Sequence, residues 1–240
     1  MKNLILTMLL VLPFTFFNLC MAEDVSSQSK ENVSMQNTGN DVDLQKQLEN
    51  AYRVGHWHNL LVSNYDGKIN AANMSWYVDS AVAFLKEQNV EDETELSDEM
   101  LETLKAELSK LKDVESISSS ITYNLQFFIE KGIVSKKLGE LFLTLYTENS
   151  SPNTIRQKIN EYVPKNKIEQ INIAIFISTL DASEAFWEEK ELYAINTRGN
   201  NDIIIADAFG SVVGGLLGSL VPVAGNIFGA AYSIMINQID

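Results

Sequence analysis

The two histidines of the chain, His56 and His58, flank Trp57 in the stretch GHWHN. Imidazole is a common metal ligand, and on a β-strand residues two apart share a face and could hold one ion together. On a helix the two rings point about 200° apart and cannot share a metal. Because the surrounding apolar spacing is helical, we expect no shared metal site, and Asn59 beside His58 predicts a local polar contact instead.

A second candidate is the stretch NYDGKINAAN at residues 64–73, which has part of the pattern of a calcium-binding loop between two helices. Asp66 and Gly67 would take the fifth and sixth positions of that loop. Its first position would be Val62, and its last would be Asn73 in place of a bidentate glutamate, so much of the ligand charge is missing. The pattern therefore favours an Asp-Gly turn between two helices.

No other stretch has the spacing of a familiar catalytic or cofactor motif. The chain contains no GxSxG, no HExxH, no phosphate loop and no dinucleotide fingerprint. Any two of the 32 acidic residues could form the carboxylate pair of a glycoside hydrolase, but nothing in the sequence selects a pair. We therefore predict a non-enzymatic protein without a cofactor or a metal, with a hydrolase of unknown type as the second alternative.

The first residues predict export. Lys2 precedes an apolar run at residues 4–19, and small residues lead to a cleavage site after Ala22, which is the pattern of a secretory signal peptide at 1–22. The alternative, lipidation of Cys20, needs a small residue before the cysteine, where Leu19 stands. We expect a location in the periplasm, in the cell envelope or outside the cell.

The charge balance limits the partners. The chain carries 18 basic and 32 acidic residues, a net charge of −14. This charge opposes binding to nucleic acid and to anionic lipid surfaces, because both are themselves negative. We expect no nucleic-acid partner, and the sequence does not indicate a small-molecule ligand.

The elements that must position any site are helices. Residues 23–40 are polar and predict a disordered linker, and residues 41–195 predict an all-α, multi-helix domain. Gly132 is expected to end one helix in the left-handed conformation, Ser135 to cap the next, and Ser151 to cap a helix that begins with proline. Apolar side chains at helical spacing are expected to point inward on the second and fourth helices. They are Trp76, Tyr77, Ala81, Phe84, Leu85, Ile117, Ile121, Leu125 and Phe128.

The C-terminal part, residues 201–238, has a different composition. Residues 209–236 carry no charge, and small residues recur every four positions, a spacing that lets two helix backbones approach closely. Pro222 divides the run, so we predict a glycine-zipper helical hairpin and not one continuous helix. The residues predicted to make its packing or membrane contacts are Gly210, Gly214, Gly218, Gly225, Gly229, Phe209, Leu216, Leu217 and Phe228.

Three stretches also resemble those of uncharacterised secreted bacterial helical proteins. They are GHWHNLLV from Gly55, SEAFWEE from Ser183, and the tail DAFGSVVGG with its later VPVAG and GA. The tail is also similar in composition to the glycine-zipper cores of small pore-forming bacteriocins. The first resemblance implies an exported all-helical protein and brings no activity with it.

These observations leave two environments open for the hairpin. In the first, the protein is secreted or envelope-associated, and the hairpin mediates membrane association or self-association into a homo-oligomer. In the alternative, the protein is a soluble secreted helical binding module, and the hairpin packs into its core. Both versions need the glycines, since each glycine costs a helix about 1 kcal/mol without a packing reason.

Overall fold

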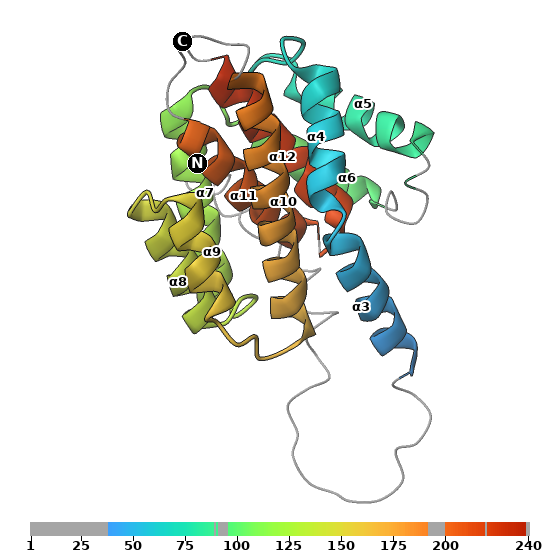
Figure 1. Cartoon of the computed structure of the whole chain (residues 1–240). Helices are drawn as coiled ribbons and strands as arrows, with labels where there is room; N and C mark the ends of the chain where they lie inside the picture. The colour runs from blue at the N-terminus through green and yellow to red at the C-terminus, as the bar shows by residue number, and fades with distance from the viewer. Residues whose placement is uncertain (1–37, 89, 91–95, 192–199, 219, 239–240) are drawn as a thin grey trace, which may run out of the picture. The chain divides into compact units, whose positions relative to one another are not determined.

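The computed structural model describes residues 38–88, 90, 96–191, 200–218 and 220–238 (Figure 1). Within these ranges the chain is all α-helical, as predicted, and contains no strand. Residues 39–240 form one compact unit. The helices are α3 (Thr38–Ala51), α4 (Val54–Tyr65), α5 (Met74–Glu87), α6 (Asp98–Leu108), α7 (Val114–Glu130), α8 (Lys136–Thr147), α9 (Pro152–Asn160), α10 (Lys167–Glu191), α11 (Asn200–Leu217) and α12 (Pro222–Asn237).

The predicted signal peptide at 1–22 lies outside the described residues. So does the predicted linker at 23–40, except for its last three residues, which belong to α3. The stretch from residue 41 to the turn at Asp66 contains two helices, since α3 ends at Ala51 and α4 begins at Val54.

The predicted helix ends are confirmed where the sequence supplied a capping residue. Gly132 follows α7 in the left-handed region, with φ +70°. The hydroxyl of Ser135 accepts a hydrogen bond from the backbone of Leu138 at 3.3 Å at the start of α8. The hydroxyl of Ser151 does the same for Thr154 at 3.3 Å, and Pro152 occupies the first turn of α9. These caps satisfy backbone groups that a helix end leaves without a partner.

The β-branched stretch at residues 171–178 lies within α10, the longest described helix. The inward residues expected on α7 are all buried, and so are Tyr77, Ala81 and Leu85 on α5. The prediction for Trp76 is wrong, because its side chain is 49% exposed. It lies about 100° around the helix from Tyr77 and packs edge-on against Tyr65, with ring centroids 6.0 Å apart, at the rim of the core.

The last two helices lie inside the fold. Helix α11 packs against α10 and α12, and α12 also packs against α4, with α5, α6 and α7 making further contacts (Figure 1). Every residue at 203–216 and at 222–235 is buried. Within the described part of the chain, none of the helices combines the length and the apolar character that crossing a membrane requires.

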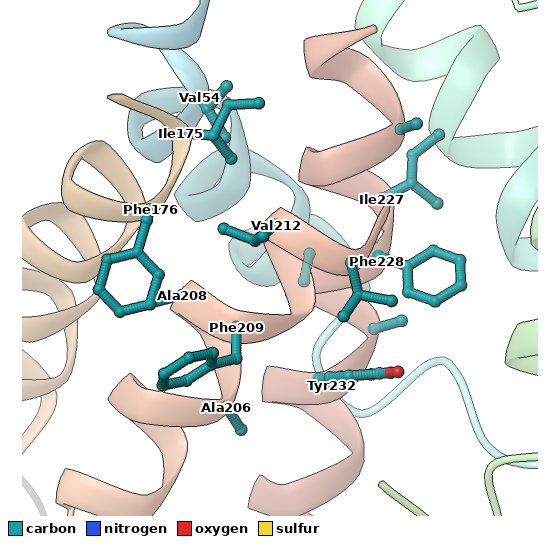
Figure 2. Close-up of a cluster of buried hydrophobic side chains, with 14 of the residues drawn as sticks. Val54, Ile175, Phe176, Ala206, Ala208, Phe209, Val212, Ile227, Phe228 and Tyr232 are labelled. Carbon is teal, nitrogen blue, oxygen red and sulfur yellow. The ribbon is translucent and has the colours of Figure 1, made fainter. Parts of the chain in front are cut away.

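Aromatic side chains from these inner helices fill the core (Figure 2). Phe209 of α11 lies edge-on to Phe176 of α10, with ring centroids 4.8 Å apart. It also lies edge-on to Phe142 of α8, at 5.9 Å. On α12, the rings of Phe228 and Tyr232 lie 5.7 Å apart. Edge-to-face contacts of this kind add to the stabilisation from buried area. The hairpin therefore supplies part of the central core of its own chain.

Candidate functional site

A buried polar cluster lies where α4, α10, α11 and α12 meet. Its centre is the Oδ2 atom of Asp207, which accepts hydrogen bonds from the hydroxyls of Ser183 at 2.5 Å and Ser233 at 3.0 Å. The indole Nε1 of Trp187 donates to the same atom at 3.4 Å, and the imidazole Nε2 of His58 lies 3.5 Å away. One carboxylate therefore connects α4 with the last three helices of the chain. We call these five residues the Asp207 cluster.

The cluster lies outside the reach of solvent. The side chains of His58 and Asp207 are both 0% exposed, and Ser183 and Ser233 are also fully buried. A carboxylate in such a place is strongly destabilised unless donors and an opposite charge surround it. Two hydroxyls, an indole and an imidazole serve this purpose here, since all of them can donate to an ionised carboxylate.

Helix α4 reaches the cluster because Gly55 allows a close approach to α10. A methyl group on Gly55 would lie 2.0 Å from the backbone oxygen of Ser178, so no larger residue fits without separating the helices. The backbone of Gly55 donates to the Ser178 hydroxyl at 3.0 Å, and the Asn59 side chain donates to the Ala182 oxygen at 2.9 Å. These two contacts, one turn apart on α4, hold this helix against α10 and direct the side chain of His58 toward Asp207.

Helix α12 reaches the cluster in the same way through Gly229. A methyl group there would lie 2.1 Å from the Ser211 hydroxyl, 2.9 Å from the backbone oxygen of Asp207 and 3.1 Å from the ring of His58. Close approach therefore requires glycine at this position. The hydroxyl of Ser211 and the Oδ1 atom of Asp207 are buried and make no hydrogen bond with any residue that the structure describes.

The five glycines named from the sequence lie between α11 and α12. A methyl group on any of them would meet an atom of the opposite helix at less than 3.0 Å. At Gly214 the nearest atoms are the Cβ of Phe228 at 2.4 Å and the backbone oxygen of Ala224 at 2.5 Å. The large side chains named with them lie within the fold, since Phe209, Leu216 and Phe228 are buried and Leu217 is half-buried.

In the structure, the two motifs that could bind a metal make other contacts. His56 is exposed while His58 is buried, so the rings lie on different sides of α4, as helical geometry predicts. The predicted polar contact is present, because the Nδ1 of His58 lies 3.0 Å from the Oδ1 of Asn59. The carboxylate of Asp66 binds Lys190 at 3.0 Å and Asn237 at 3.1 Å. Among the described residues, no three His, Cys, Asp or Glu side chains group closely enough to hold a metal ion.

The Asp207 cluster has residue types of a serine hydrolase in a different arrangement. The hydroxyl of Ser183 donates to Asp207 itself, whereas a serine nucleophile donates to an imidazole that takes its proton. The burial of Ser183, His58 and Asp207 also separates them from any substrate. What the arrangement can do is join helices through a buried charge.

Reasoning from the sequence alone did not identify this cluster, although a signal was present. The three stretches singled out by resemblance each contribute to it: GHWHN supplies His58, SEAFW supplies Ser183 and Trp187, and the tail supplies Asp207. A further signal is the position of Asp207 next to the uncharged run at residues 209–236, because a charge in apolar surroundings needs a partner. Comparison with protein-family models, curated proteins and solved structures found no match to this chain.

Proposed function

We propose that this chain is an exported, non-enzymatic helical binding module whose C-terminal hairpin is its internal scaffold. The observation that carries the proposal is the burial of residues 203–216 and 222–235 by helices of the same chain. Burial of this extent leaves the apolar side chains of the hairpin without an outer face for another molecule. Partners would then contact the outer surface, where Tyr52 between α3 and α4, Trp76 of α5 and Tyr123 of α7 are exposed.

Within this proposal, α11 and α12 form a glycine-zipper hairpin. Support comes from the five glycines, because the opposite helix occupies the place that a side chain would need at each of them. Further support comes from the bonds between the hairpin and its surroundings. The hydroxyl of Tyr77 donates to the backbone oxygen of Ile227 at 3.0 Å, and the hydroxyls of Ser120 and Tyr232 lie 2.9 Å apart.

Truncation tests the proposal. A protein ending at Asn200 lacks both hairpin helices, so it should lose cooperative thermal unfolding, because the remaining helices have no shared core to pack around. A protein beginning at Thr38 is the control, since it keeps all the described helices. Circular dichroism and calorimetry measure both. A truncated protein that still unfolds cooperatively at the control's temperature would overturn the proposal.

A second candidate function is membrane association through the same hairpin. The observation that favours it is the absence of any charged residue in the sequence at 209–236. To reach lipid, the hairpin would have to leave the helices that now cover it, at the cost of the core. Flotation of the full chain with phosphatidylcholine vesicles tests this candidate. Recovery of the protein with the vesicles supports it, and recovery in the dense fraction together with cooperative unfolding supports the scaffold.

A further inference from the structure

We propose that His58 is a proton-binding site that ties the hairpin to the outer helices. When its ring carries both protons, it binds Asp207 and holds α11 against α4; when it loses one, the buried carboxylate loses its only charged neighbour among the residues of the cluster. This proposal goes beyond the scaffold function, because it makes attachment of the hairpin depend on pH. The species that this site binds is a proton.

The hydrogen bonds around the ring determine its charge. The amide nitrogen of Asn59 donates to Ala182, so the other atom of that amide, Oδ1, faces the imidazole as an acceptor. The Nδ1 of His58 must then carry a hydrogen. On the opposite side, Nε2 lies 3.5 Å from the carboxylate of Asp207. A neutral ring would place a lone pair against that anion, so the geometry favours a second hydrogen on Nε2 and hence the imidazolium.

The groups that face His58 from the neighbouring helices act in the same direction or carry no charge. Ser183 and Trp187 of α10 and Ser233 of α12 are neutral donors that point at Asp207. Lys190 of α10 lies over the ring of Trp187, 5.0 Å from its centre. Within the described part of the chain, Asp207 is the charged group that acts on the imidazole.

The direction of the effect on stability follows from the pKa of His58. Burial alone lowers this pKa, but the charge of Asp207 and polar contacts with Asp207, Asn59 and the backbone of Gly229 raise it above the ordinary value of 6.5. In the unfolded chain the ring loses its proton near pH 6.5. The stabilisation is therefore fully present below about pH 6.5 and is lost as the pH rises through the higher pKa of the folded protein.

Unfolding in urea at several pH values between 5.5 and 8.5 tests the proposal on the full chain. Above about pH 6.5 the equilibrium constant for unfolding should rise by up to tenfold per pH unit in the wild-type protein. His58→Gln should abolish this dependence. His56→Gln is the matched control, since it removes the exposed histidine two residues away and should leave the dependence intact. Equal pH dependence in the wild-type protein and His58→Gln would overturn the proposal.

A second measurement does not require the His58 variant to fold. In His56→Gln the remaining histidine is His58, so its ring nitrogens can be read without ambiguity by ¹⁵N nuclear magnetic resonance. We expect the signals of a doubly protonated ring at pH 7, and their replacement by those of a neutral ring only at higher pH. A neutral ring in the folded protein at pH 7 would refute the proposed tie, whatever the stability measurements show.

Discussion

Asp207→Asn removes one negative charge from the Asp207 cluster while keeping the size of the side chain. Three donors of the cluster, the two serine hydroxyls and the indole, would lose a charged acceptor, and the buried ring of His58 would lose its counter-ion. Hydrogen bonds to charged groups contribute about 1.5–3 kcal/mol each. Breaking a buried ion pair by removing one partner costs about 3–5 kcal/mol. Because these effects overlap, we expect a loss of about 4 kcal/mol.

Urea unfolding followed by circular dichroism measures this loss. With a slope of about 2.5 kcal/mol per molar urea, a loss of about 4 kcal/mol lowers the unfolding midpoint by about 1.6 M. The slope itself should stay unchanged, since the substitution leaves the surface exposed on unfolding almost the same. The double variant Asp207→Asn, His58→Gln should lose less than the sum of the two single variants, because neither partner is then left as a stranded charge.

Asp202→Asn is the control for this experiment. Asp202 lies on the same helix but is exposed, in the first turn of α11, where a negative charge stabilises the helix by less than about 1 kcal/mol. The reasoning is refuted if Asp207→Asn shifts the midpoint no more than this control does. Such a result would mean that the cluster fills space without its charge contributing to stability.

Two further substitutions test the packing of the hairpin. Gly214→Ala places a methyl group 2.4 Å from Phe228 and 2.5 Å from the backbone of Ala224. Alanine gains about 1 kcal/mol in helix propensity, but the overlap outweighs this gain, so we expect the folded protein to lose about 1–3 kcal/mol of stability. Gly215→Ala is the matched control, because its methyl group meets only the end of the Ile175 side chain, at 3.1 Å, and it should be neutral or stabilising. Equal urea midpoints for the Gly214→Ala and Gly215→Ala proteins would contradict the role of Gly214. Tyr77→Phe removes the buried hydrogen bond to α12 and should lower the free energy of unfolding by about 1 kcal/mol. The same urea unfolding measures this loss, and an unchanged midpoint would show that the bond does not contribute to stability.

Much of the local structure could be predicted from the sequence, because its causes are local. The left-handed end at Gly132 and the serine caps at Ser135 and Ser151 depend on residues within a few positions, and all three are present. Trp76 was the exception, since the orientation of a residue at the edge of an apolar stripe depends on what packs beside it.

The environment of the hairpin depends on contacts that no local pattern contains. The glycine spacing at residues 210–229 is equally compatible with lipid and with a protein core, because both are apolar. The helices that cover the hairpin in this fold are the preceding α10 and also α4, α5, α6 and α7, which lie much earlier in the chain. The same holds for the Asp207 cluster, since His58 and Asp207 meet only when α4 and α11 pack together. Local patterns were therefore enough to predict the helical class, several helix ends and the residues able to pack closely. What the hairpin packs against and which group its aspartate meets depend on tertiary contacts, because α4, which supplies His58, lies more than a hundred residues before α11 in the chain.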